Sequence, residues 1–106
     1  MQINGQAVDG FDWDAHNRDK ILRKHGITKE QVEHLFHVGR FQLERDEAHS
    51  AAEARYTAVG RDADGRPMAV TFTLRWSRDR VLLRPISARR MHAHERRHYE
   101  EDLGEA

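Results

Sequence analysis

The feature that most constrains the fold is the alternation of side chains along residues 67–76, PMAVTFTLRW. A period of two places alternate side chains on opposite faces of a β-strand. Four large apolar residues share one face: Met68, Val70, Phe72 and Leu74. A turn signal stands on each side of the segment, Asp64-Gly65 before it and Ser-Arg-Asp after it. The segment is therefore predicted to be an inner strand of an antiparallel meander.

Shorter alternating segments predict further strands around this one. They lie at residues 11–13, 41–43, 53–60 and about 80–88. Pro85 has no backbone N–H to donate, so we expect its strand to lie at an edge or to be interrupted there.

Two helices are predicted before the meander, from their capping residues. Asp14 can cap a helix over about residues 15–25, and Gly26 follows as the residue that ends it. Thr28 begins a second helix with a capping box, and Gly39 ends it.

A last helix is predicted over about residues 90–103. The order of elements indicates an α+β fold in a single domain, residues 1–106. It would have two N-terminal helices, an antiparallel sheet of three to four strands, and a C-terminal helix packed on the sheet.

Composition excludes several classes of protein. The chain has no cysteine, so it can form neither a disulfide framework nor a thiolate metal site. It shows no signal peptide pattern and no apolar segment long enough to span a bilayer. We expect a soluble, cytoplasmic protein without a membrane partner.

Charge is distributed unevenly, although the chain has 18 basic and 18 acidic residues. Residues 55–97 hold eleven arginines against four acids, whereas residues 1–53 hold seven basic and ten acidic groups. Arginine binds phosphate through a planar fork of donors, so the second half suggests a polyanion or an acidic partner. A high-GC genome that favours arginine codons would give the same composition.

The segment His94–His98, HERRH, matches the H-E-x-x-H pattern of zinc hydrolases. No histidine follows His98 as a third ligand, and the chain has eight histidines, so chance pairs are expected. Helical spacing also places the two histidines on the flank of the helix. A zinc hydrolase is therefore a weak alternative, and no metal site is predicted.

The same spacing gives Glu95 a central position. The most apolar line of the helix consists of Met91, Glu95, Tyr99 and Leu103. We expect this line to face the sheet, where a partly buried carboxylate needs a partner. The candidate partners are Arg75, Arg84 and Arg89.

Charged side chains recur at strand ends and on the polar face of the predicted sheet. They are Glu53, Arg55, Arg75 and Arg89, with Glu95 and Tyr99 on the helix. RNA cleavage without a metal requires such groups: the 2′-hydroxyl must lose a proton, the phosphorane must be neutralised, and the leaving 5′-oxygen must be protonated. A solvated face with ordinary ion pairs would have the same sequence pattern.

Four blocks of sequence follow one another in a specific order. They are FDWDAHNRDKILRKHGIT, HSAAEARYTAVG, GRPMAVTFTLR and RPISARRMHAHERRHYEE, over about residues 11–101. In this order they resemble the BrnT-type toxins of bacterial type II toxin–antitoxin systems. The most specific pieces are Lys24-His25-Gly26, Glu53-Ala54-Arg55, and Ser87-Ala88-Arg89 followed by Glu95 and Tyr99. The chain departs from many members at Asn17 and Lys20, where they have a lysine and an asparagine.

The resemblance implies a RelE-like fold and a metal-independent ribonuclease that cleaves RNA, arrests translation and needs no cofactor. It also implies an antitoxin with a ribbon-helix-helix domain, through which the complex would bind operator DNA. A non-catalytic RelE-like member, which only binds its antitoxin or RNA, is the alternative.

The resemblance also implies roles for individual residues. The catalytic candidates are Glu53, Arg55, Arg75, Arg89, Glu95 and Tyr99, and the RNA-binding candidates are Lys24 and His25. The three arginines would converge on the phosphate, and Glu53 or Glu95 would act as the base or orient it. Tyr99 would position the RNA or assist proton transfer.

Overall fold

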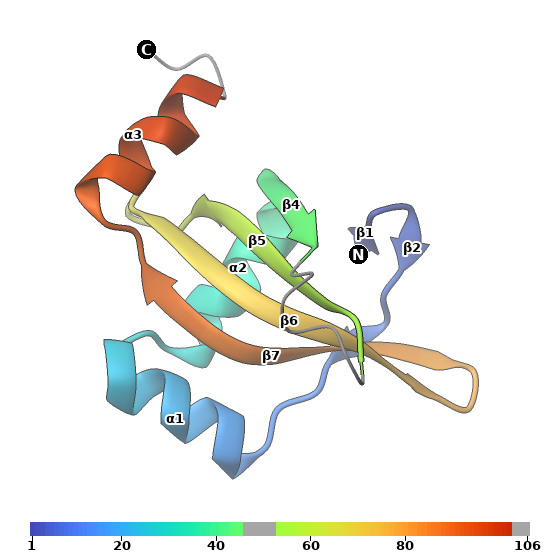
Figure 1. The fold of residues 1–106 in the computed structure, drawn as a ribbon. Helices are drawn as coiled ribbons and strands as arrows, with labels where there is room; N and C mark the ends of the chain where they lie inside the picture. The colour runs from blue at the N-terminus through green and yellow to red at the C-terminus, as the bar shows by residue number, and fades with distance from the viewer. Residues whose placement is uncertain (46–52, 103–106) are drawn as a thin grey trace.

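Five strands form one mixed sheet, in the spatial order β3-β7-β6-β5-β4 (Figure 1). The computed structural model describes residues 1–45 and 53–102, with side chains to residue 98. The strands are β3 Gly10–Phe11, β4 Phe41–Arg45, β5 Arg55–Arg61, β6 Pro67–Ser77 and β7 Arg80–Arg90. Strands β4 to β7 pair antiparallel, as predicted, whereas β3 lies parallel to β7. The α+β class is confirmed, and the expected antiparallel sheet of three to four strands is corrected to a mixed sheet of five.

The parallel edge strand is shorter than predicted, and its pairing has no signal in the sequence pattern. Only two of its residues pair with β7, one position before the strand predicted at residues 11–13. Asp9 fixes the pairing, because its carboxylate accepts a hydrogen bond from Val81 N and its backbone N–H donates to Val81 O, both at 2.8 Å. A separate ribbon of β1 Gln2–Ile3 and β2 Gln6–Ala7 precedes it, and no sequence pattern predicts that ribbon.

The two N-terminal helices are α1 Ala15–His25 and α2 Lys29–Val38. Asp14 and Thr28 cap them, each through a side chain that accepts a hydrogen bond from the backbone three residues later. Gly26 and Gly39 end them in the left-handed conformation, with φ of 65° and 75°, which glycine adopts without steric cost. The predicted bounds of both helices are confirmed.

Helix α2 packs on one face of the sheet and forms the hydrophobic core with it. Phe36 of α2 contacts Phe72 of β6 and Phe41 of β4 edge to face, each with ring centroids 5.3 Å apart. Met68 and Val70 lie on the same face as Phe72, and all three are fully buried. The alternation in β6 therefore identified the core face of the sheet correctly.

The opposite face of the sheet carries polar side chains. In Figure 1, α2 lies behind the sheet and α1 runs beside the β7 edge, so neither helix covers the face toward the viewer. On that face the hydroxyls of Thr57 and Thr71 share a hydrogen bond of 3.2 Å. Strand register adds Arg55 of β5, Arg75 of β6 and Arg89 of β7. We call the surface formed by these five residues the open face.

Pro85 interrupts the pairing of β7, as predicted. The register of β6 against β7 shifts between Thr71 and Phe72, and Pro85 lies opposite Phe72. The carbonyl oxygen of Pro85 accepts a hydrogen bond of 2.9 Å from Asn17 Nδ2, which also donates to the carbonyl oxygen of Asp12 at 3.1 Å. Buried Asn17, one of the two departures from the common pattern, therefore ties α1 to β7.

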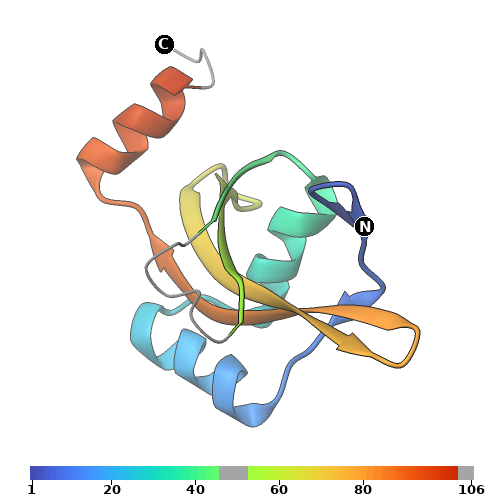
Figure 2. The same ribbon diagram turned by 45° about the vertical axis from the view of Figure 1, so that its right-hand side comes forward.

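The C-terminal helix, α3 Ala93–Asp102, does not pack on the sheet. In both ribbon views it leaves the end of β7 and extends away from the strands (Figures 1 and 2). The prediction that it lies against the sheet is therefore wrong. Residues 92–98 contain one small apolar side chain, Ala93. Packing this segment on the sheet would remove charged groups from water and would bury little apolar surface. Like the other two helices of the described chain, α3 is too short and too polar to cross a membrane.

Candidate functional site

At the end of β7, Arg89 forms a two-point ion pair with the first turn of α3. Its Nη1 and Nη2 donate to Glu95 Oε1 and Oε2 at 2.9 and 2.8 Å. The backbone N–H of His92 donates to Glu95 Oε1 at 3.1 Å. The expectation that Glu95 pairs with an arginine of the sheet is confirmed, and the partner is Arg89.

This pairing changes the acidity of Glu95. The hydrogen bonds from Arg89, and then the one from the His92 backbone, lower the pKa of Glu95 from its ordinary 4.5 to about 2. The same pair raises the pKa of Arg89. A general base works best when its pKa lies near the working pH, so Glu95 in this pair is suited to holding the guanidinium rather than to accepting a proton.

A groove of about 250 Å³ opens beside the pair, on the same side of the sheet. Met91 packs against Val59 and Ala69 at its base, and His94 and His98 line its wall together with Glu95. Residues four apart share one face of a helix, which is why both imidazoles reach the same groove. Sequence reasoning assigned these histidines no role. Their spacing is visible in the sequence, where it matches the zinc pattern H-E-x-x-H.

The strand that carries Arg89 is held in place by its neighbour Arg90. Arg90 Nη1 donates to Asp62 Oδ2 at 2.6 Å, and Asp62 also accepts from the backbone N–H groups of Asp64 and Arg66 at 2.9 and 2.8 Å. Burial raises the pKa of Asp62, but these hydrogen bonds outweigh it, so the net pKa is lowered. Asp62 therefore stays ionised and fixes the end of the strand.

A second pair, Arg75 with Glu53, lies at the other end of the open face. Arg75 Nε is 3.4 Å from Glu53 Oε2, and Nη2 is 3.5 Å from Oε1. Both side chains are nearly half exposed, at 49% and 42%. Next to them, Thr73 donates to the carbonyl oxygen of Ala54 at 2.8 Å, which fixes the chain just before Arg55.

The three arginines share a face but do not meet at one point. Arg89 lies opposite Ala69 of β6 and Arg55 lies opposite Thr73, so they stand about 13 Å apart along the strand at 3.3 Å per residue. Arg75 stands about 20 Å from Arg89 on the same scale. The expected convergence is not observed, because antiparallel pairing brings the end of β7 beside the beginning of β6.

The remaining predicted residues lie outside these two pairs. Arg84, which was a candidate partner of Glu95, instead contacts Asp14 at 2.9 Å and Asp12 at 3.6 Å. Lys24 and His25 are exposed in the last turn of α1, and that end of α1 lies beside the end of β7 in both views (Figures 1 and 2). The side chain of Tyr99 lies outside the described residues. Within residues 1–45 and 53–102, no three histidine or acidic side chains are grouped as metal ligands.

Comparison with known protein families gives a match over most of the chain. A model of the family described as "Ribonuclease toxin, BrnT, of type II toxin-antitoxin system" matches residues 13–95. That range includes both arginine–carboxylate pairs of the open face. No curated protein matches the chain closely enough to count as a relative.

Proposed function

The chain belongs to the BrnT family of ribonuclease toxins of type II toxin–antitoxin systems, and we propose that it is itself a metal-independent endoribonuclease that inhibits translation by cleaving RNA. The observation that carries this proposal is the open face, a sheet surface that neither α1 nor α2 covers, with an arginine–carboxylate pair at each end. Guanidinium groups spaced along a sheet can follow the phosphates of a single strand.

We place the chemistry at the Arg89 end. The attacking 2′-oxygen forms a bond to phosphorus while the bond from phosphorus to the 5′-oxygen breaks, which leaves a 2′,3′-cyclic phosphate and a 5′-hydroxyl. Arg89 neutralises the negative charge that develops on the phosphorane oxygens. Glu95, which holds both arms of that guanidinium at 2.8 and 2.9 Å, fixes its orientation.

Two protons must move in this reaction, one from the 2′-hydroxyl and one to the 5′-oxygen. His94 and His98 line the groove beside Arg89, and histidine is the commonest general acid and base in proteins. Glu53 lies with Arg75, about 20 Å away along β6. We therefore assign proton transfer to the two histidines rather than to Glu53 or Glu95. Tyr99, which follows His98 in α3, is kept as a candidate for positioning the RNA.

The other charged residues are proposed to bind the strand on either side of the reacting phosphate. Arg55 and Arg75 would contact phosphates toward one end of the open face. Lys24 and His25, exposed at the end of α1, would contact them toward the other. Removing one of these phosphate contacts should lower the slope of log RNA affinity against log salt concentration by about one.

A toxin of this family has an antitoxin partner. We propose that this antitoxin carries a ribbon-helix-helix domain and that the complex binds operator DNA through it, as the sequence resemblance implies. The second candidate function is a member that binds RNA or its antitoxin without cleavage. One observation favours that alternative, because Glu95 already occupies both arms of Arg89.

RNA cleavage with and without EDTA, beside the variants Arg89→Ala and Arg89→Lys, tests the proposal. We expect cleavage by the wild type that survives EDTA, loss of about 100-fold in Arg89→Ala, and partial activity in Arg89→Lys. Intact RNA throughout would indicate a binding protein. Loss with EDTA alone would indicate that a metal is required.

A further inference from the structure

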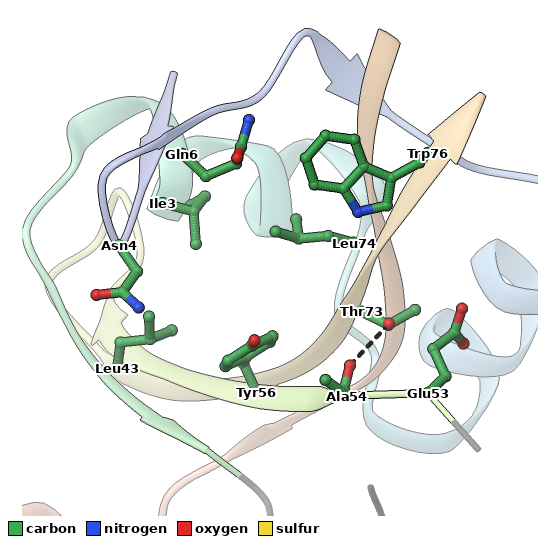
Figure 3. A pocket seen from close by; sticks show the side chains of 10 residues that line it. All are labelled: Ile3, Asn4, Gln6, Leu43, Glu53, Ala54, Tyr56, Thr73, Leu74 and Trp76. Carbon is green, nitrogen blue, oxygen red and sulfur yellow. Dashed lines mark hydrogen bonds between the residues drawn. The ribbon is translucent and has the colours of Figure 1, made fainter. Parts of the chain in front are cut away.

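We propose that a second pocket, at the Arg75 end of the molecule, binds an unpaired base of the RNA strand. The pocket has a volume of about 340 Å³ and lies between the β1–β2 ribbon and the strands β4, β5 and β6 (Figure 3). This is within the range of small-ligand sites in proteins, roughly 300–1,000 Å³. The inference rests on the proposed function, because the base would belong to the RNA strand where it passes Arg75 and Glu53 from the open face to the other side of β6, where the pocket lies.

Aromatic and aliphatic side chains form the body of the pocket. Trp76 and Tyr56 border it from two sides, with Leu74 between them and Leu43 and Ile3 closing the rest (Figure 3). Tyr56 is fixed from behind by Phe72, with ring centroids 5.7 Å apart. A rigid aromatic wall of this kind suits stacking of a flat, uncharged ring.

Trp76 is the most exposed of the large hydrophobic side chains in the described chain, at 67%. It lies on the core side of β6, directly opposite Val81 of β7. An indole left in water at the mouth of a pocket gains apolar contact when a ring stacks on it. Base stacking on aromatic side chains is a main source of affinity for single-stranded nucleic acid.

The rim of the pocket is polar, which favours a base over an apolar peptide. Asn4 and Gln6 of the ribbon supply amide groups, and Glu53 supplies a carboxylate. Amides and carboxylates are among the side chains that hydrogen-bond to base edges. Glu53 also holds Arg75, so a cation stands outside the pocket where the phosphate of a bound nucleotide would lie. The aromatic side chains match the base of a nucleotide, the polar rim matches the edge of that base, and Arg75 matches its phosphate.

Tryptophan fluorescence can report this binding directly, because the chain has two tryptophans. Trp13 donates to Glu33 Oε2 at 2.8 Å and packs against the core, away from the pocket. In the Trp13→Phe variant, Trp76 is therefore the single reporter. The probe is a single-stranded 2′-O-methyl oligoribonucleotide, which cannot be cleaved through a 2′-hydroxyl, beside an abasic strand with the same phosphates.

We expect the oligonucleotide with bases to quench Trp76 and the abasic strand to leave it unchanged. Trp76→Ala should weaken binding of the strand with bases about tenfold. Leu22→Ala, which removes another exposed apolar side chain outside this pocket, should have no effect. If Trp13→Phe fails to fold by circular dichroism, the difference in quenching between the wild type and Trp76→Phe gives the same information.

Different results would contradict the base-binding pocket and the proposed ribonuclease activity. Wild-type cleavage of RNA without base-dependent quenching would overturn the pocket and leave the ribonuclease. Base-dependent quenching without cleavage by the wild type would support the pocket and overturn the ribonuclease. If Trp76→Ala weakens antitoxin binding but leaves oligonucleotide binding unchanged, the pocket is a protein-binding site and the inference is wrong.

Discussion

The open face has the same two residue types at its two ends, yet the ends differ in how firmly those residues are held. Arg89 and Glu95 form two hydrogen bonds of 2.9 and 2.8 Å, whereas Arg75 and Glu53 are 3.4 and 3.5 Å apart. The first carboxylate has its pKa lowered to about 2 by its partner. The second pair is the more exposed of the two.

The difference comes from the backbone around each pair. Glu95 stands in the first turn of α3 and accepts a hydrogen bond from His92 N, while Arg90 anchors the strand to buried Asp62. Among the described contacts, the anchor nearest Glu53 is the hydrogen bond from Thr73 to the carbonyl oxygen of Ala54, and the Glu53 carboxylate contacts Arg75 at 3.4 and 3.5 Å. A pair in fixed geometry can orient a charge for a reaction, whereas a looser pair can open for a substrate at small cost. This difference supports our proposal that RNA reacts at the Arg89–Glu95 end, the firm end, and is bound at the Arg75–Glu53 end, the loose end.

The largest effect should come from removing the anchor of the firm end. Asp62→Ala leaves Arg90 unpaired and two backbone N–H groups without their acceptor, so we expect the free energy of unfolding to fall by about 3 kcal/mol. Urea denaturation measures this change in the free energy of unfolding. Asp64→Ala, whose side chain is 74% exposed, should change stability by less than about 0.5 kcal/mol. Equal effects of the two variants would show that Asp62 is no anchor.

The stability that the Arg89–Glu95 pair contributes should depend on pH, because the pair requires an ionised Glu95. The pKa of Glu95 is about 2 in the folded protein against an ordinary 4.5. The stabilisation from the pair is therefore complete above about pH 4.5 and is lost as the pH falls toward 2. NMR titration of the Glu95 carboxyl should give a midpoint near 2, and Arg89→Gln should move it toward 4.5. The titration of Asp14, held by α1 and Arg84, should not change. A wild-type midpoint near 4.5 would contradict the firm pair.

The smallest effect should come from neutralising each carboxylate without changing its shape. Glu95→Gln should lower the hydrogen-exchange protection of α3, by about 1 kcal/mol or less, because the helix loses its charged contact with β7. Glu53→Gln should change protection at the start of β5 by less than about 0.5 kcal/mol. Hydrogen–deuterium exchange resolved by segment measures both. A larger loss in Glu53→Gln would reverse the assignment of firm and loose ends.

Much of the fold could be predicted, because its signals are local. Capping residues such as Asp14 and Gly26 bound the helices, and the alternation in β6 identified the core face. The position of α3 could not be predicted in this way. Helical spacing shows which residues share a face, but not whether that face meets another element. The parallel pairing of β3 with β7 was equally hidden, since the two partners lie about 70 residues apart along the chain.

The candidate site was predicted in part, for a related reason. The partner of Glu95 was narrowed to three arginines and proved to be Arg89. Whether Arg75 and Arg89 meet depends on which ends of two antiparallel strands lie together, and that is set by the register of the sheet. The pocket beside Trp76 depends on the β1–β2 ribbon, which no pattern predicted. Local periodicity does not predict contacts between segments that are distant in the sequence.

Steady-state kinetics of RNA cleavage by Arg89→Ala and Arg75→Ala tests the division between the two ends most directly. Arg89→Ala should lower kcat about 100-fold, because the removed group acts on the transition state. Arg75→Ala should raise KM about tenfold and leave kcat within about twofold, because the removed group binds substrate and transition state alike. If Arg75→Ala lowers kcat as much as Arg89→Ala does, or if Arg89→Ala changes KM alone, the assignment of chemistry to the firm end is wrong.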